Sequence, residues 1–278
     1  MTRRFAMLAA AAVTVGSLGL AAVAELHTAT APPSPAASPA AAYAVAAHQG
    51  LPAAAPGRPG PDFAACEQQL ERAQPDGRPR LAVLGASFTA GVGSSPGHSW
   101  AVVLARQLHW DAVVYGVPGA GYVRAGVGRG GPVAAEVAHA GLRALAPSLI
   151  IVQVGHDDIG VPAALERQRV TQAITTLRAQ APAARIVLLT VFPGRSAQAA
   201  AYRTDHAIVT AAQTADPAVI IIDPLTGKWI FPRIRDGLHP TAAGSAWIAS
   251  KVGSILDGHG VRPAPAGAGP APIICDHA

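Results

Sequence analysis

Hydrophobic residues fall in short continuous runs from residue 80 onward, and amphipathic stretches separate these runs. A continuous run of about four to eight apolar residues is typical of a strand that is buried on both faces of a sheet. An alternating run would instead indicate a strand with one face in water. The continuous runs predict strands at residues 80–85, 111–117, 148–155, 184–192 and 218–223.

The stretches between the runs have helical spacing, in which apolar residues recur about every three or four positions. Val170, Ile174 and Leu177, for example, would share one face of a helix. The spacing predicts helices at residues 99–108, 132–145, 164–180, 197–214 and 241–256.

The alternation of buried strands with helices predicts an α/β fold of three layers, built on a doubly wound parallel sheet of five strands. Ligands of such sheets bind beyond the carboxyl ends of the strands. Ser87, the loops at residues 116–121 and 155–158, and the segment after Asp223 all follow strand ends. We therefore expect these segments to lie along one edge of the sheet.

The amino-terminal residues have a different composition from the rest of the chain. Residues 1–24 contain Arg3 and Arg4, then a run of Ala, Leu and Val, and they end in Ala-Val-Ala. This is the pattern of a secretory signal peptide. An uncleaved membrane anchor is the alternative, because an apolar run of about 20 residues can span a bilayer. Its weak hydrophobicity favours cleavage near Ala24, and either reading predicts a secreted or extracytoplasmic protein.

Residues 25–65 are rich in Ala, Pro and Ser, and they hold few large apolar side chains. Such a segment cannot bury enough surface to offset the entropy of ordering, so it predicts a disordered linker. Residues 66–278 then form one domain of ordinary size. Its ends carry Cys66 and Cys275, the only two cysteines. In an oxidising compartment this pair predicts a disulfide, and two unpaired thiols are the alternative.

The formal net charge is +5, and it becomes 5 − 2 = +3 if Arg3 and Arg4 leave with the signal peptide. The basic residues are scattered, and only Lys228 and Lys251 are lysines. No basic stripe is interleaved with aromatic residues, which argues against nucleic acid as a partner. A loose association with an anionic envelope surface is compatible with this charge. We expect a monomer.

Four short segments at the expected strand ends carry polar or glycine residues that could serve chemistry. Each is ambiguous by itself, because a Gly-x-Ser can simply cap a helix, Gly-Ala-Gly can form a tight loop, and Asp-x-x-His before proline is often a turn. Their order along successive strands carries more information than any one of them. The segments are GASFT (85–89), YGVPGAGY (115–122), VGHDDIG (154–160) and DGLHP (236–240).

This order resembles that of the SGNH hydrolases, the GDSL-type esterases, over about residues 80–257. The resemblance implies that Ser87 is the nucleophile and that the N–H of Gly119 helps to bind the oxyanion. It also implies that Asp236 and His239 are the acid and base of a triad. A flavodoxin-like strand order, 2-1-3-4-5, follows from the same resemblance.

The chemistry of these side chains agrees with the implied roles. A serine hydroxyl is a weak nucleophile until a base removes its proton, and the imidazole of His239 can do so near neutral pH. Asp236 can accept a hydrogen bond from the other ring nitrogen and fix the tautomer. The nucleophile elbow of α/β-hydrolases needs glycine where Thr89 stands, which disfavours that fold.

Two positions depart from the family pattern. Ala86 replaces the aspartate of Gly-Asp-Ser, a change that should alter loop hydrogen bonds more than chemistry. Asp157 replaces the asparagine of Gly-x-Asn-Asp, and an ionised carboxylate has no proton to donate to an oxyanion. Three explanations stay open. Asp157 is protonated through burial and its neighbour Asp158, or His156 or a backbone N–H replaces it as donor, or the site is catalytically weak.

No metal or cofactor is expected. His156 and the two aspartates after it are consecutive, and consecutive residues seldom point at one metal ion. GVGRGG (126–131) fits the spacing of a dinucleotide loop, but it does not end a strand and Pro132 follows it. Trp229 and Phe231, near DGLHP, are candidates to face a substrate, and the loops at 121–131 and 224–235 would line the pocket.

The sequence therefore predicts a secreted serine esterase that hydrolyses carboxylic esters, either acyl lipids or O-acylated glycans, without a cofactor. Ser87, Asp236 and His239 would form the triad, and Ser87, Gly119 and Asp157 would form the oxyanion hole. The alternative is a catalytically weak envelope protein that binds acylated glycans or lipids on the same scaffold. Asp157 favours this alternative, and the complete Ser-His-Asp set opposes it.

Overall fold

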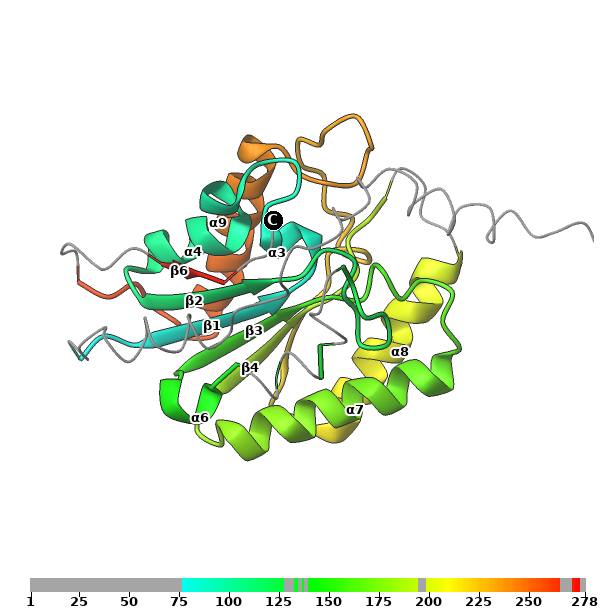
Figure 1. The fold of residues 1–278 in the computed structure, drawn as a ribbon, viewed down its shortest axis with the longest axis horizontal. Helices are drawn as coiled ribbons and strands as arrows, with labels where there is room; N and C mark the ends of the chain where they lie inside the picture. Colours follow the sequence, from blue (N-terminus) through cyan, green and yellow to red (C-terminus); the bar gives the residue numbers. More distant parts are fainter. Residues whose placement is uncertain are drawn as a thin grey trace, which may run out of the picture. The chain divides into compact units, whose positions relative to one another are not determined.

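Six parallel strands form one sheet in the part of the chain that the structure describes, in the order β5-β4-β3-β1-β2-β6 (Figure 1). The computed structural model describes residues 77–127, 133–134, 137, 140–194, 199–265 and 272–275. The predicted signal peptide, linker and Cys66 lie outside these residues. The strands are β1 (Arg80–Gly85), β2 (Asp111–Gly116), β3 (Leu149–Gln153), β4 (Arg185–Leu189), β5 (Ile220–Ile222) and β6 (Ile273–Ile274).

The first five strands confirm the predicted α/β class and the order 2-1-3-4-5. The expected number of five strands was wrong, because β6 pairs in parallel with the outer edge of β2. This strand has two residues and lies in a Gly- and Pro-rich tail, so it leaves no hydrophobic run. Its neighbour Cys275 extends the pairing, since its N–H donates to the carbonyl of Val114 at 2.7 Å.

Helices follow each of the central strands, and polar caps define where two of them begin. Ser99 accepts a hydrogen bond from the N–H of Val102, and Thr241 accepts one from the N–H of Gly244, so α4 and α9 start at the next residue. The helices are α3 (Ser87–Ala90), η1 (Pro96–His98), α4 (Trp100–Leu108), α6 (Leu142–Leu145), α7 (Ala163–Gln180), α8 (Ala199–Ala215) and α9 (Ala242–Gly258).

The helix predicted over residues 132–145 is not continuous. Helical backbone occurs at 133–134 and at Val137, but the chain leaves the helix at Ala140 and Gly141. Gly141 has a left-handed φ of 56°, which ends one helical segment and starts α6 in a new direction. Apolar spacing alone did not reveal this break.

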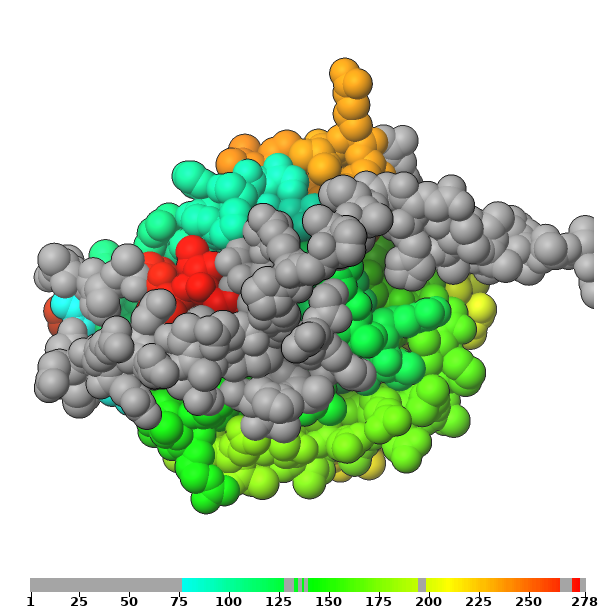
Figure 2. Space-filling model, in the orientation of Figure 1, coloured from blue at the N-terminus to red at the C-terminus, as the bar shows by residue number. Residues whose placement is uncertain are grey.

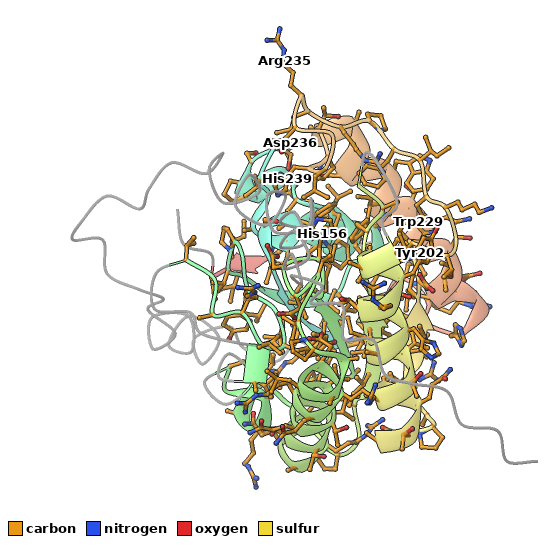
Figure 3. The ribbon with its side chains drawn as sticks, turned by 90° about the vertical axis from the view of Figure 1, so that its right-hand side faces the viewer. His156, Tyr202, Trp229, Arg235, Asp236 and His239 are labelled. Carbon is orange, nitrogen blue, oxygen red and sulfur yellow. The ribbon has the colours of Figure 1, made fainter. Side chains whose placement is uncertain are left out.

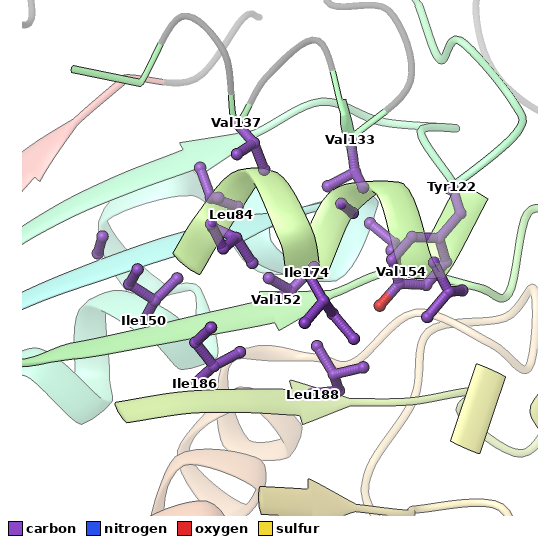
Figure 4. Packing of buried hydrophobic residues seen from close by; sticks show 14 of the residues in the cluster. Leu84, Tyr122, Val133, Val137, Ile150, Val152, Val154, Ile174, Ile186 and Leu188 are labelled. Carbon is purple, nitrogen blue, oxygen red and sulfur yellow. The ribbon is translucent and has the colours of Figure 1, made fainter. Parts of the chain in front are cut away.

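The sheet separates two hydrophobic layers, so the fold has the three layers that were predicted. Figure 1 shows α4 and α9 on one side of the sheet and α7 and α8 on the other. Alternate residues of each strand face opposite layers: Leu81 packs toward α4 and α9, whereas Leu84 packs toward α7. Figure 4 shows the second layer, where Ile174 of α7 lies over Val152 of β3.

Within the described residues, none of the helices is both long and apolar enough to cross a bilayer.

Candidate active site

Ser87 stands directly beyond the carboxyl end of β1, as the first residue of the single-turn helix α3. Two glycines allow this helix to press against the strand ends. A Cβ on Gly85 would lie 2.1 Å from Oγ1 of Thr89, and a Cβ on Gly116 would lie 2.4 Å from the backbone N of Ala90. Any larger residue at either glycine would push α3 away and move Ser87 with it.

Asp236 and His239 lie in a tight turn that precedes α9. Oδ1 of Asp236 accepts hydrogen bonds from the backbone N–H groups of Leu238, at 2.8 Å, and His239, at 3.0 Å. Such a bond from an aspartate to the backbone two residues on is a common turn former. Gly237 supplies the left-handed φ of 73° that the turn needs, and the N–H of Ile234 donates to the carbonyl of His239 at 2.9 Å.

The structure brings Ser87, His239 and Asp236 into one hydrogen-bonded line. Oγ of Ser87 lies 2.9 Å from Nε2 of His239, and Nδ1 of His239 lies 2.6 Å from Oδ2 of Asp236. A carboxylate can only accept, so Nδ1 carries the proton and Nε2 accepts from the serine hydroxyl. This arrangement can take the proton of Ser87 during nucleophilic attack.

The line runs from the interior to the surface. Ser87 is buried, His239 is half-buried and Asp236 is exposed. Figure 3 shows Asp236 and His239 at one end of the molecule, with Arg235 extending away from them. The segment around residues 230–240, orange in Figure 2, projects from the surface. Asp236 is therefore the member of the line that solvent reaches most easily.

The environment of Asp236 keeps its carboxyl group ionised at neutral pH. Partial burial alone would raise the pKa of Asp236, but the hydrogen bonds from His239 and from two backbone N–H groups outweigh it and lower the pKa. An ionised Asp236 is the form that holds His239 in the correct tautomer.

The backbone N–H groups of Ser87 and Gly119, at this edge of the sheet, have no backbone acceptor among the described residues. Gly119 follows β2 and has a left-handed φ of 79°. Its loop is held by neighbouring bonds, since the N–H of Ala120 donates to the carbonyl of Val117 at 3.0 Å. Free N–H groups beside a serine nucleophile are what an oxyanion hole requires.

Asp157 and Asp158 have opposite environments, although they are adjacent. Asp158 is fully buried, and its carboxyl group accepts hydrogen bonds from backbone N–H groups of the loop after β2. The carboxyl group of Asp157 receives a hydrogen bond from its own backbone N–H alone among the described residues. Burial and the charge of Asp158 raise the pKa of Asp157 to about 7. A large share of Asp157 is therefore protonated at neutral pH and can donate a hydrogen bond.

His156 is uncharged at this site. Its Nδ1 lies 3.3 Å from the carbonyl oxygen of Phe192, so this nitrogen carries the proton. Burial lowers the pKa of His156 to about 4. Figure 3 places His156 below His239 at the same end of the molecule.

The expectation that Trp229 and Phe231 face a substrate was wrong. They are only 6% and 5% exposed, because both pack in the core layer beneath α9. The aromatic residue beside His239 is instead Phe88, whose ring centroid lies 5.6 Å from the imidazole and 4.3 Å from the stacked ring of Phe192. The only sequence signal for Phe88 was its position directly after the candidate nucleophile.

No group of three or more His, Cys, Asp or Glu side chains is placed to hold a metal ion within the described residues. The glycine-rich segment at 126–131 lies partly outside them, with only Gly126 and Val127 described.

Three solved structures share this fold with the chain. The first is the salicylyl-acyltransferase SsfX3 from a tetracycline biosynthetic pathway, with 18% identity and a TM-score of 0.54, covering 67% of this chain and 56% of that one. The second is a family two carbohydrate esterase from Clostridium thermocellum in complex with cellohexaose, with 14% identity and a TM-score of 0.50, covering 66% of this chain and 65% of that one. The third is the acetyl xylan esterase Est2A from the rumen bacterium Butyrivibrio proteoclasticus, with 15% identity and a TM-score of 0.52, covering 66% of this chain and 65% of that one.

The chain spans less than two thirds of the length of each of these three structures. At such low identity the likeness establishes the fold, and no curated protein matches the sequence. The sequence itself matches the GDSL-like Lipase/Acylhydrolase family over residues 83–247, a segment that includes every residue of the candidate site. The chain therefore belongs to the GDSL-like lipase/acylhydrolase, or SGNH, family.

Proposed function

We propose that the chain is a serine esterase that hydrolyses carboxylic esters, with Ser87 as nucleophile, His239 as general base and Asp236 as the group that orients His239. The observation that carries this proposal is the pair of contacts at His239, 2.9 Å to Ser87 and 2.6 Å to Asp236. Membership of an acylhydrolase family supports the same reaction class.

In the proposed reaction, Oγ of Ser87 attacks the acyl carbon while its proton passes to Nε2 of His239. The N–H groups of Ser87 and Gly119 and the protonated carboxyl group of Asp157 stabilise the oxyanion of the tetrahedral intermediate. His239 then gives its proton to the leaving alcohol. Water enters, loses a proton to His239, and releases the acid from Ser87.

O-acylated glycans are the first substrates to test. Two of the fold relatives are described as a carbohydrate esterase and an acetyl xylan esterase, and one of them is bound to cellohexaose. Acyl lipids are the alternative, and transfer to another hydroxyl is a variant of the same chemistry, as the description of SsfX3 illustrates. We propose that this activity lies outside the cytoplasm, and the signal-peptide pattern of residues 1–24 supports that location.

A second candidate function is binding of acylated glycans or lipids without efficient turnover. Asp157 favours it, because an ionised carboxylate at this position would repel an oxyanion and the loss of one donor costs about 10²–10³ in turnover. The two functions differ in whether Ser87 reacts.

Labelling with a fluorophosphonate probe tests the proposal, because the probe reacts only with an activated serine. We expect the wild-type protein to be labelled and Ser87→Ala to remain unlabelled. Ser95→Ala is a matched control, since Ser95 is a half-buried serine whose Oγ lies 2.9 Å from Nδ1 of His98 in a second Ser-His pair. A wild-type protein that stays unlabelled at every pH from about 5 to 9, the range in which histidine can act as base, would favour the binding function.

A further inference from the structure

Two carboxyl groups lie together behind the candidate active site, and neither takes part in the proposed proton transfer. Asp158 follows β3, and Glu166 lies in the first turn of α7. Both are 0% exposed. Buried carboxyl groups are costly unless hydrogen bonds or neutralisation compensate them, so this pair requires an explanation.

The carboxyl group of Asp158 accepts three backbone hydrogen bonds from the loop after β2. Its oxygens accept from the N–H groups of Tyr122 at 2.6 Å, Val123 at 3.2 Å and Arg124 at 2.9 Å. The approach is so close that a Cβ on Gly121 would lie 2.2 Å from Oδ2 of Asp158. Glycine is therefore required where the carboxyl group meets the loop.

Glu166 has no such support. Its two carboxyl oxygens are buried, and no N–H or hydroxyl donor from the described residues reaches them. The side chain of Asp158 is the hydrogen-bonding group that acts on Glu166. Burial and the neighbouring Asp158 raise the pKa of Glu166 to about 9. The backbone N–H groups stabilise a charge on Asp158 but none does so on Glu166, so Asp158 is the carboxylate and Glu166 is the neutral acid beside it.

We propose that Glu166 and Asp158 share a proton and act as positioning residues, which hold the loop at residues 119–124 in place for catalysis. This inference rests on the proposed esterase function. Gly119 lies three residues before Tyr122, and the N–H of Gly121 donates to the carbonyl of Arg124 at 2.9 Å, which makes the loop one connected unit. Asp157 precedes Asp158 directly. The pair thus ties together both loops that carry proposed oxyanion donors.

The pair also predicts how the site responds to alkaline pH. Loss of the Glu166 proton would place two carboxylates side by side in an interior without water. Their repulsion would displace Asp158 and free the loop at residues 119–124 from its hydrogen bonds. The other charged or titratable groups that act on the pair are Tyr122, Asp157 and Arg124. Burial raises the pKa of Tyr122 well above its ordinary value, so Tyr122 does not titrate with Glu166. Asp157, whose pKa is about 7, titrates at a lower pH than Glu166.

The test compares ester turnover by Glu166→Gln and the wild-type protein between pH 7 and 10. Glutamine keeps a hydrogen-bond donor and cannot ionise, so we expect similar kcat at pH 7 and about a tenfold advantage for the variant one pH unit above the pKa of Glu166. Glu166→Ala should lower kcat about 10–100-fold at pH 7, with little change in KM, because it loosens an oxyanion donor rather than the substrate pocket. Asp205→Asn alters a buried carboxyl group elsewhere and should not change the alkaline profile.

Hydrogen exchange of the amides of residues 122–124 provides a readout that does not need activity. We expect their protection, relative to Glu166→Gln at the same pH, to fall in the wild-type protein above about pH 9. A wild-type protein without turnover or probe labelling would disprove the proposed function, and the exchange experiment would still test the pair. The inference would be overturned if the ratio of kcat in Glu166→Gln to kcat in the wild-type protein stayed constant from pH 7 to 10 and the amides of residues 122–124 kept the same protection in both proteins.

Discussion

Oγ of Ser87 lies 2.9 Å from Nε2 of His239, although the two residues are 152 positions apart in the chain. Gly93 lies where their loops meet. A Cβ on this glycine would lie 2.6 Å from the carbonyl oxygen of Pro240 and 3.2 Å from Cβ of His239. The distance between hydroxyl and imidazole therefore depends on a close backbone approach that only glycine permits.

Gly93→Ala should separate Ser87 from His239. Gly93 has a left-handed φ of 88°, so the substitution adds backbone strain to the steric clash. We expect a loss of about 1–3 kcal/mol in the free energy of unfolding, measured by urea denaturation, and at least a tenfold loss of kcat, because small misplacements of catalytic groups are costly. Gly97→Ala is the control, since a Cβ there has no atom within 4 Å. Equal activity of the two variants would contradict this role of Gly93.

Asp236→Asn should abolish most of the activity and leave the fold intact. The asparagine oxygen can still accept from the N–H groups of Leu238 and His239, which preserves the turn. The amide cannot stabilise the imidazolium or fix the correct tautomer, so kcat should fall by about 10⁴. Steady-state kinetics and thermal unfolding measure both effects.

Asp223→Asn is the matched control for this change, because Asp223 caps a similar turn by accepting from the N–H of Thr226 at 2.9 Å. A loss of less than about tenfold in Asp236→Asn would mean that Asp236 does not support His239.

Asp157→Asn should raise ester turnover above neutral pH. In the wild-type protein the pKa of Asp157 is about 7, so the carboxyl group loses its donor proton as the pH rises through 7. The asparagine amide keeps a donor at every pH. The ratio of kcat in the variant to kcat in the wild-type protein should therefore increase to about ten at one pH unit above the pKa of Asp157. An identical pH profile would show that Asp157 is not an oxyanion donor.

The same substitution should alter the pH dependence of stability. The raised pKa of Asp157 means that the folded protein keeps a proton that the unfolded chain has already lost above about pH 4. The stabilisation is full below the pKa of the unfolded state, and it is lost as the pH rises toward 7. Urea denaturation from pH 4 to 7 should therefore show a shallower decline in the free energy of unfolding for Asp157→Asn. If the free energy of unfolding declined equally with pH in both proteins, the pKa of Asp157 would not be raised in the folded state.

The disulfide between Cys66 and Cys275 stays a prediction, because Cys66 lies outside the described residues. Cys275 is buried and follows β6 at the edge of the sheet. Thiol titration of the denatured protein should find no free thiol before reduction and two after it, the number of cysteines in the chain. Reduction should lower the free energy of unfolding by about 2–4 kcal/mol. Equal numbers of free thiols before and after reduction would show that the predicted disulfide does not form.

Local sequence was sufficient for most of the fold. The run RLAVLG coincides with β1 at both ends, because a strand that is buried on both faces must be apolar throughout. Local sequence did not predict the break in the helix over 132–145 or the existence of strand β6. Gly141, with its left-handed φ, breaks the helix. Strand β6 has two residues and is defined by its pairing with β2.

The sequence by itself determined the order of buried strands and helices, and with it the edge of the sheet where Ser87, Gly119, Asp157 and His239 gather. Those features follow from periodicity and from the geometry of parallel sheets, which act over short stretches of chain. Only the tertiary structure decided that Phe88 rather than Trp229 lies beside His239, and that Glu166 of α7 meets Asp158. Burial and electrostatic coupling depend on the residues that packing brings together from distant segments, so no local pattern could reveal them.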